Sequence, residues 1–387
     1  MLEFREARIV ARSDCVFGEI GSRCMANMPG KTAHTTVSFS AFDDIARDHH
    51  REDIRFALAT PADYAAIEQL TRSAEDVDEP WSRQAIAWLL DANPDGPGFM
   101  VLARGRDTDR ILGYFTFYPK LLHSGPELVP AFLFVRLYVC QEIRRRGIFE
   151  TMTRLGMALL KFAGIEYAYS VPNRYSTPGF VKLGMRDQGD VGLWVRPTWR
   201  IWPYVSSFPK LSRLAVEPIE SFGAQWDDFF EYPYRGQAAV RGARSAARLN
   251  WRYKDRPDAE YRMWGVRSRD ELVGYCITRA TKVKGVPALV VCDFWLHPGN
   301  EEMLRMAVAT ALREAGSESP RLVAAFVSVP SGPERRAIRQ AGFLSVPKSI
   351  VPWRMPLIGT CPARMNGKTP LPDARSWFIT PYDWDVY

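Results

Sequence analysis

Residues 137–149 read Leu-Tyr-Val-Cys-Gln-Glu-Ile-Arg-Arg-Arg-Gly-Ile-Phe, a run that changes character twice. An apolar strand comes first, three arginines and a glycine then turn the chain, and an amphipathic helix follows. Beyond Gly147 the apolar side chains recur at alternating steps of four and three residues, at Ile148, Met152, Leu155, Leu159 and Phe162. This spacing predicts a helix that buries one face.

The turn at Gly147 has the features of an anion-binding site. The start of a helix presents free backbone N–H groups and the positive end of the helix dipole, and the arginines add guanidinium groups. A glycine lets the backbone come close to the anion because it has no side chain. The combination suits a pyrophosphate, and the alternative for three consecutive arginines is a basic surface turn.

Placed between a strand and a helix, Arg144-x-x-Gly147-x-Phe149 resembles the acyl-CoA pyrophosphate loop of the GCN5-related N-acetyltransferase superfamily. The usual pattern in that family is Gln/Arg-x-x-Gly-x-Gly/Ala, so the first two anchors match and Phe149 departs from it. A later family pattern, Asn-x-x-Ala-x-x-Leu-Tyr-x-x-x-Gly-Phe, also has a counterpart here. After a strand predicted over 165–171, the matching positions are Asn173, Ser176, Phe180 and Gly184.

The resemblance covers residues 54–197 and implies an α/β fold, with a mixed and mostly antiparallel sheet flanked by helices. The rest of this half of the chain fits that fold. A helix is predicted over 63–70, and strands are predicted over 54–58, 99–103, 110–117 and 131–139.

The second half of the chain repeats the first faintly. Ser170-Val171-Pro172 precedes Gly184 by the interval that separates Ser328-Val329-Pro330 from Gly342. Upstream, the Gly-Tyr pair at 113–114 has a partner at 274–275, at nearly the same offset. The shared order predicts a second, degenerate domain of the same fold.

The second copy lacks the arginine loop. Residues 297–302 stand in its place and read His-Pro-Gly-Asn-Glu-Glu. Two carboxylates at a helix start would repel a pyrophosphate, although they suit the helix dipole. We therefore predict that this copy does not bind coenzyme A.

Five segments follow from these patterns. Residues 1–52 are interpreted as an N-terminal extension, either disordered or ahead of the true start. The others are an acyl-CoA-binding domain over 53–197, a linker over 198–213, a degenerate domain over 214–356 and a C-terminal tail over 357–387. A further helix, basic in character, is predicted over 238–250.

The composition indicates an ordinary globular protein. The chain has 387 residues, an apolar fraction of 47% and six cysteines without metal-ligand spacing, which favours reduced thiols. No apolar run is long enough to span a membrane, and the first residues lack the apolar core of a secretory signal, so a cytoplasmic protein is predicted. The net charge of +7 favours anionic partners, but no nucleic-acid-binding motif accompanies it. A homo-oligomer stays open.

The resemblance also implies a set of binding residues. Acetyl-CoA is the expected co-substrate, without a metal, and a small-molecule primary amine is the expected acceptor. The loop residues Arg144, Arg145, Arg146, Gly147, Ile148 and Phe149 should hold the pyrophosphate. The strand residues Leu137, Tyr138 and Val139 should meet the pantetheine arm, and a backbone N–H near Tyr138 or Val139 should polarise the thioester oxygen. Asn173, Ser176 and Phe180 should also contact the cofactor.

The catalytic residues are harder to predict. Many relatives carry a tyrosine that reprotonates the leaving thiolate, but this chain has Phe180 at the matching position. Tyr175 is the candidate acid and Glu142 the candidate base. His123 is a further candidate, and the structural alternative for it is a surface histidine. Cys140 is another, and the structural alternative for it is a small buried residue. Two alternatives to an acetyltransferase stay open, a catalytically silent acyl-CoA-binding protein and an aminoacyl-tRNA-dependent transferase with twin domains.

Overall fold

The computed structural model describes residues 39–74, 80–165, 167–198, 214–231, 238, 240–315, 320–329, 331–351, 354–361 and 374–384. All of them belong to one compact unit, Thr36–Tyr387. The predicted linker from residue 199 onwards and residues 1–38 of the predicted extension lie outside the described residues. Among the helices that the structure describes, none is both long and apolar enough to cross a membrane.

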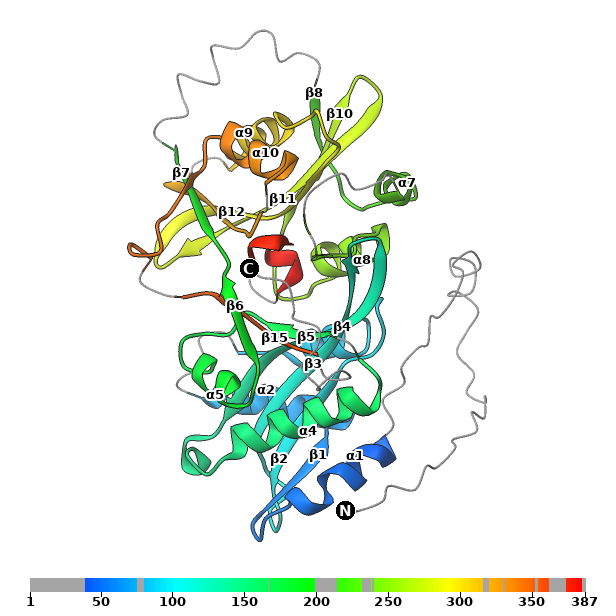
Figure 1. The fold of residues 1–387 in the computed structure, drawn as a ribbon, viewed down its shortest axis with the longest axis vertical. Coiled ribbons are helices and arrows are strands. Elements are labelled where there is room, and N and C mark those ends of the chain that lie inside the picture. The colour runs from blue at the N-terminus through cyan, green and yellow to red at the C-terminus, as the bar shows by residue number, and fades with distance from the viewer. Residues whose placement is uncertain are drawn as a thin grey trace. The chain divides into compact units, whose positions relative to one another are not determined.

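The first sheet is mixed and mostly antiparallel, as the resemblance implies (Figure 1). Its parallel neighbours are β4 with β5 and, at one end of β3, β9 with β16. Along the sheet, the strands are β1 (Ile54–Leu58), β2 (Phe99–Gly105), β3 (Ile111–Ser124), β4 (Glu127–Val139), β5 (Tyr167–Ser170), β15 (Pro356–Thr360) and β6 (Arg186–Asp190). The short strands β9 (Val240–Gly242) and β16 (Trp377–Phe378) extend it beside β3.

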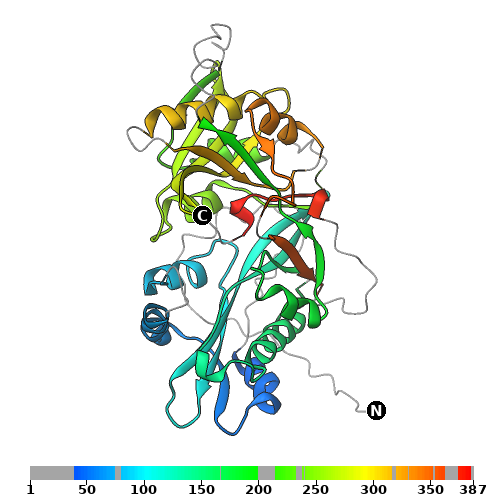
Figure 2. The same cartoon turned by 90° about the vertical axis from the view of Figure 1, so that its left-hand side faces the viewer.

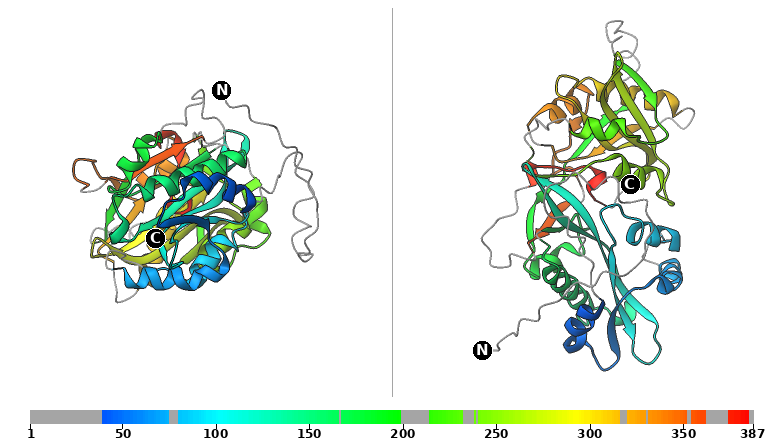
Figure 3. Two further views of the ribbon diagram at one scale, coloured as in Figure 1. Left: turned by 90° about the horizontal axis from the view of Figure 1, so that it is seen from below. Right: turned by 90° about the vertical axis from the view of Figure 1, so that its right-hand side faces the viewer.

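Helices cover both faces of this sheet (Figures 2 and 3). Helices α1 (Phe39–Ala46) and α4 (Ile148–Phe162) pack on one face, and α2 (Tyr64–Ser73) and α3 (Arg83–Leu90) pack on the other. The predicted helix after Gly147 is confirmed, with Ile148, Met152, Leu155 and Leu159 buried. Phe162 is the exception, because it is 60% exposed at the helix end.

Helix α1 corrects the prediction of a disordered extension over 1–52. Phe42 and Ala46 are fully buried in the core between α1, α4 and the sheet. The surrounding sequence has no clear periodicity, so the amphipathic spacing of this short helix gives no distinct signal.

The second sheet repeats the architecture of the first. Along it run β14 (Leu344–Ser345), β7 (Leu193–Pro197), β13 (Leu322–Phe326), β12 (Val286–Leu296), β11 (Glu271–Val283), β10 (Arg262–Ser268) and β8 (Leu214–Pro218). The strand pair β12–β13 is parallel, like β4–β5. Helix α9 (Met303–Glu314) follows β12 and helix α10 (Pro333–Gln340) follows β13, as α4 follows β4 and α5 (Thr177–Lys182) follows β5.

The glycines of the repeated motifs have the same structural roles in both halves of the chain. A Cβ atom would lie 2.9 Å from the carbonyl oxygen of Tyr138 at Gly113, and 2.6 Å from that of Trp295 at Gly274. Gly184 and Gly342 both have left-handed backbones, with φ of +87° and +84°. Each pair occupies one position in two copies of the same fold.

The two sheets exchange strands, which the predicted domain borders missed. Strand β7 lies within 53–197 but pairs with β13 and β14 in the second sheet. Strand β15 was assigned largely to the tail from 357 onwards, yet it lies between β5 and β6 in the first sheet. Each apolar strand completes the sheet of the other half, so the chain is not divided at 197 or 356.

The segment 238–250 is not one basic helix. It contains β9, the single turn α8 (Ala246–Leu249) and the start of a π-helical turn, η6 (Asn250–Lys254). Its arginines are half-buried or buried, and Arg244 lies fully buried between carboxylates of β12 and of the tail. The remaining elements are α7 (Gln225–Glu231) and the 3₁₀ turns η1 (Arg47–His49), η2 (Pro61–Asp63), η3 (Gln141–Ile143), η8 (Ala374–Ser376) and η9 (Pro381–Asp383).

Candidate functional site

The turn between β4 and α4 leaves a helix N-terminus open. Gly147 is the N-cap residue, with φ of +74° and ψ of 12°, a left-handed conformation that glycine adopts without strain. No side chain caps the helix there. The backbone hydrogen bond that Thr151 donates to the Gly147 carbonyl closes the first turn. The N–H groups of residues 148–150 therefore have no acceptor within the helix, and they suit an anion.

The three arginines of the loop have three different roles. Arg144 donates from Nε to the carbonyl of Val139 at 2.8 Å, which ties the loop to the end of β4. Arg146 forms an ion pair with Asp53 at 2.7 Å, so its charge is already balanced. Arg145 has a left-handed backbone, with φ of +61°, and among the described residues it has no carboxylate partner. Arg145 is therefore the guanidinium available to a ligand.

A pocket of about 270 Å³ lies at the start of α4. Its lining includes the cations Arg144, Arg145 and Lys182, which come from the loop and from α5. Glu150 also lines it, but this carboxylate is bound by Arg154 at 2.8 Å and lies 4.0 Å from Lys182. The hydrogen bond from Arg154 lowers the pKa of Glu150. The lining therefore carries an excess of positive charge.

The large side chain of Phe149 fits at the third anchor position of the motif because it turns away from the loop. Its ring is turned onto α5, where a Cβ atom at Gly179 would lie 2.6 Å from Cε1 of the ring. The ring centroid lies 5.0 Å from that of Phe180. Phe149 and Gly179 are thus a matched pair that joins the start of α4 to α5.

Beside the pocket, β4 separates from β5. The two strands pair only over Ala131–Leu133 and Tyr167–Tyr169, and β4 continues for residues 134–139 beyond the last pair. A β-bulge lies in this part, because Phe115 of β3 faces both Arg136 and Leu137, and Arg136 has φ of +48°. The bulge turns the strand away from β5. The resulting opening is where the resemblance places the pantetheine arm.

Of the predicted strand residues, Val139 is buried and lines the pocket, whereas Leu137 and Tyr138 are half-buried on the part of β4 beyond its last pair with β5. Ile148 also lines the pocket. The loop and the end of β4, both of which are predicted to meet the cofactor, are thus adjacent in space.

Asn173 and Ser176 have a structural partner in each other. The Asn173 Oδ1 accepts hydrogen bonds from the backbone N–H groups of Tyr175 and Ser176, at 2.9 and 3.1 Å, and from the Ser176 hydroxyl at 3.1 Å. These bonds hold the turn that starts α5. Neither residue is among those that line the pocket.

The candidate catalytic residues lie outside the pocket lining. Tyr175 is 77% exposed on the turn before α5. Glu142 is bound to Arg110 at 2.7 Å. Phe180, which was predicted to contact the cofactor, is 2% exposed in the core and is not among the residues that line the pocket. His123 pairs with Leu128 at the other end of β3, ten residues and about 34 Å from Gly113 beside the loop, so it is not a base for chemistry there.

Cys140 is buried at the end of β4, and burial raises the pKa of its thiol, which supports a structural role. Among the described residues, no group of three or more His, Cys, Asp or Glu side chains is arranged to hold a metal ion.

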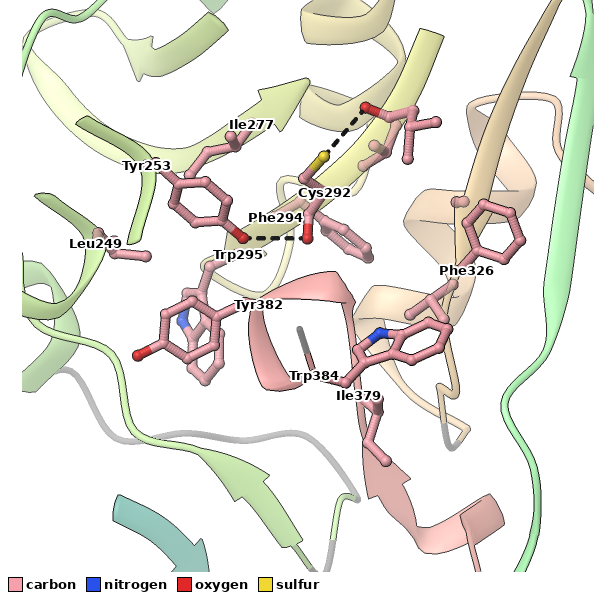
Figure 4. Packing of buried hydrophobic residues seen from close by; sticks show 14 of the residues in the cluster. Leu249, Tyr253, Ile277, Cys292, Phe294, Trp295, Phe326, Ile379, Tyr382 and Trp384 are labelled. Carbon is pink, nitrogen blue, oxygen red and sulfur yellow. Dashed lines mark hydrogen bonds between the residues drawn. The ribbon is translucent and has the colours of Figure 1, made fainter. Parts of the chain in front are cut away.

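In the second sheet β12 and β13 diverge in the same way, but residues of the C-terminal tail lie between them. Strands β12 and β13 pair only over 288–291 and 322–325. Ile379 pairs with Ser328 just after β13, and the Thr380 hydroxyl donates to Asp293 of β12 at 2.7 Å. Figure 4 shows Trp384 of the tail beside Phe326 at the end of β13, with Ile379 on the other side of Trp384.

The loop of the second copy is also occupied by a carboxylate. Burial acts to raise the pKa of Glu301, but the hydrogen bond from Arg336 and the N–H groups of Glu301 and Gly299 outweigh it and lower that pKa. The side chain is held by Arg336 at 2.6 Å. Both features support the prediction that this copy does not bind coenzyme A.

Comparison with known proteins rests on structure alone, since no protein-family model and no curated protein matches the sequence. A probable N-acyltransferase from Enterococcus faecalis has a TM-score of 0.58 at 13% identity, over 80% of this chain and 73% of that one. A GCN5-related N-acetyltransferase from Anabaena variabilis gives 0.58 at 14%, over 80% and 73%. The chain has the fold of the GCN5-related N-acetyltransferases.

N-myristoyltransferase from Saccharomyces cerevisiae, solved with bound myristoyl-CoA, is also similar, with a TM-score of 0.50 at 10% identity over 80% of this chain and 78% of that one. At these identities the likeness establishes the fold, and it confirms the expected sheet architecture. Chemistry has to be argued from the residues of the site.

Proposed function

We propose that this protein is an acyl-CoA-dependent N-acyltransferase that transfers an acyl group, in the simplest case acetyl, to a small-molecule primary amine. One observation carries the proposal. The uncapped start of α4 and Arg145, which has no carboxylate partner among the described residues, meet in a cationic pocket beside the part of β4 that lies beyond its last pair with β5. Structural neighbours that are N-acetyltransferases, and one that holds myristoyl-CoA, support acyl-CoA as the ligand.

In this proposal, the N–H groups of residues 148–150 and Arg145 bind the pyrophosphate. The pantetheine arm runs along residues 134–139 of β4, which lie beyond the last pair with β5. A backbone N–H near Tyr138 or Val139 polarises the thioester oxygen. Backbone donors that are fixed before the reaction stabilise a developing oxyanion without reorganisation.

The reaction is a direct acyl transfer. The amine nitrogen forms a bond to the thioester carbon, the bond from that carbon to sulfur breaks, and the amine loses a proton as the thiolate gains one. Glu142 as base and Tyr175 as acid are proposals, each tested by the rate of CoA release from the Glu142→Gln or Tyr175→Phe variant. Solvent is the alternative proton donor, because Phe180 carries no acidic proton.

Calorimetric titration with acetyl-CoA tests the binding step. Loss of one charge-assisted hydrogen bond costs about 1.5–3 kcal/mol, so Arg145→Ala should weaken binding roughly 10- to 100-fold. Arg72→Ala, on α2 at the other face of the sheet, removes the same charge and should leave binding unchanged. Absence of binding by the folded wild type would overturn the proposal.

A catalytically silent acyl-CoA-binding protein is the second candidate, favoured by the burial of Phe180 where relatives carry an acid. Incubation of the protein with acetyl-CoA and a panel of primary amines separates the two. Release of CoA with any amine supports the transferase, and intact acetyl-CoA with every amine supports the binding protein.

A further inference from the structure

The β-bulge of β4 turns side chains towards the face of the sheet that α2 and α3 cover. Arg136, the left-handed residue of the bulge, has its guanidinium 5.0 Å from the ring centroid of Trp81, which packs in the core on that face. Tyr138 lies on the same face, because it pairs with Tyr114 of β3 and their ring centroids are 5.9 Å apart. Bulges re-aim side chains in this way next to active sites. We call Trp81, Tyr114, Arg136 and Tyr138 the bulge cluster.

The bulge cluster lies beside the backbone groups that the proposed function assigns to the thioester. Tyr138 carries one of the two candidate N–H groups, and Arg136 precedes it by about 6–7 Å of strand. On the α4 face this stretch is closed to an acceptor. Phe115 and Phe134 are buried there at 1% exposure each, and Val139 lines the pocket proposed for the pyrophosphate. An acceptor amine therefore has to reach the thioester from the face of the bulge cluster.

Tyr114 offers a hydrogen-bond donor on that face. Burial raises the pKa of its phenol, and the nearby charge of Arg136 opposes that shift, so the phenol keeps its proton at neutral pH. The side chain is 4% exposed, and its hydroxyl makes no hydrogen bond to the described residues. A buried hydroxyl without a partner costs free energy, which a ligand that accepts its hydrogen bond would recover.

Arg136 adds a positive charge near the same hydroxyl. An arginine that lies over an aromatic ring can still bind a carboxylate, because its five N–H donors lie in the plane of the guanidinium. Arg136 and Tyr138 are half-buried, so solvent reaches the cluster at these two residues. A guanidinium and a hydroxyl that both donate suit an oxyanion.

We propose that the amine acceptor carries an anionic group, in the simplest case the carboxylate of an amino acid, and that Arg136 and Tyr114 bind this group. The inference rests on the proposed function and names the class of its acceptor. In an amino acid the amino group is close to the carboxylate. Binding of the carboxylate by the bulge cluster therefore holds the nitrogen beside Tyr138, where the thioester is proposed to lie.

Pairs of acceptors that differ in charge test this inference. The wild type is incubated with acetyl-CoA and each of the common amino acids or its amide, and with phosphoethanolamine or ethanolamine, and release of CoA is followed with a thiol reagent. At least one anionic amine should have a kcat/KM at least tenfold above that of its neutral partner. The amides have the larger fraction of free amine at a given pH, so a preference for an amino acid would not come from the amine itself. Preference for an amino acid assigns a carboxylate to the site, and preference for phosphoethanolamine alone assigns a phosphate.

Variants test the two residues. Arg136→Met should raise the KM of the preferred acceptor roughly 10- to 100-fold, since it removes a charge-assisted contact, and Arg136→Lys should raise it less. Tyr114→Phe should raise it about 2- to 10-fold, as loss of a neutral hydrogen bond does. Calorimetric titration should show unchanged binding of acetyl-CoA in all three, because the pocket lies on the other face. Arg279→Met is the matched control, since Arg279 is half-buried on a strand of the second sheet with its guanidinium 5.7 Å from the ring centroid of Tyr261.

The outcomes separate the two proposals. Absence of acetyl-CoA binding by the folded wild type overturns the proposed function, and this inference with it. Neutral amines that react as fast as their anionic partners overturn the inference alone, and this comparison needs no variant. Binding of acetyl-CoA without turnover of any anionic amine in the panel also overturns it, as does an Arg136→Met variant with an unchanged KM for the preferred acceptor.

Discussion

Two arginines of this chain offer a controlled test of how burial changes the worth of an ion pair. Arg244 lies between Asp293 and Asp383, with N–O distances of 3.0 Å to each. Arg354 lies between Asp187 and Asp190, at 2.9 and 3.1 Å. The side chain of Arg244 is 1% exposed and that of Arg354 is 57% exposed. The geometry is matched, and burial differs.

Arg244→Met should lower the free energy of unfolding by about 3–5 kcal/mol, because it leaves buried carboxylates without their cation. The loss should not double for two carboxylates. Asp293 keeps hydroxyl donors from Tyr275 at 2.6 Å and Thr380 at 2.7 Å, and Asp383 keeps the N–H of Thr380 at 3.0 Å. Arg354→Met should cost at most about 1 kcal/mol, as exposed pairs do.

Urea denaturation of the wild type and both variants, followed by circular dichroism at pH 7, measures the difference. A total stability of about 5–15 kcal/mol means that the Arg244 variant loses a large part of it. Losses within 1 kcal/mol of each other would refute the argument that burial of the charges decides the cost.

Three further outcomes follow from the same structure. Burial lowers the pKa of Lys120 to about 7, whereas the unfolded chain keeps that proton up to about pH 10. The free energy of unfolding should therefore rise with pH between these values, by up to about 1.4 kcal/mol per pH unit. The Lys120→Met variant should lose this slope in urea melts at pH 7, 8 and 9. Phe180→Tyr should cost about 1–3 kcal/mol by burying a hydroxyl among rings, and an unchanged melt would mean that the hydroxyl reaches the opening. Acetyl-CoA should bind once per chain in a calorimetric titration, because Glu301 occupies the second loop, and a stoichiometry of two would contradict this.

Local patterns predicted the parts of the fold that local forces decide. The helix predicted from the steps of apolar residues after Gly147 is confirmed, and the repeated glycines Gly184 and Gly342 have the same left-handed backbone conformation. In each case a single element carries its own signal, either a helix period or a backbone conformation that only glycine adopts easily.

The exchange of β7 and β15 could not be predicted in this way. An apolar strand shows that it is buried, but its sequence does not say which of two similar sheets receives it. For the same reason, the separate roles of the three loop arginines could not be predicted from the sequence around them. Arg146 is distinguished from Arg145 by Asp53, which lies 93 residues away in the sequence.

Strand β15 has a consequence for how this protein is made. It lies between β5 and β6 in the first sheet, yet it is synthesised only after residue 355 of 387. During synthesis of the second half, the edges of β5 and β6 that later pair with β15 have no partner strand. Domains usually fold as they emerge, N-terminal first, and exposed strand edges promote aggregation. The nascent chain should therefore depend on chaperones while residues 191–355 are synthesised, and either half expressed alone should be insoluble.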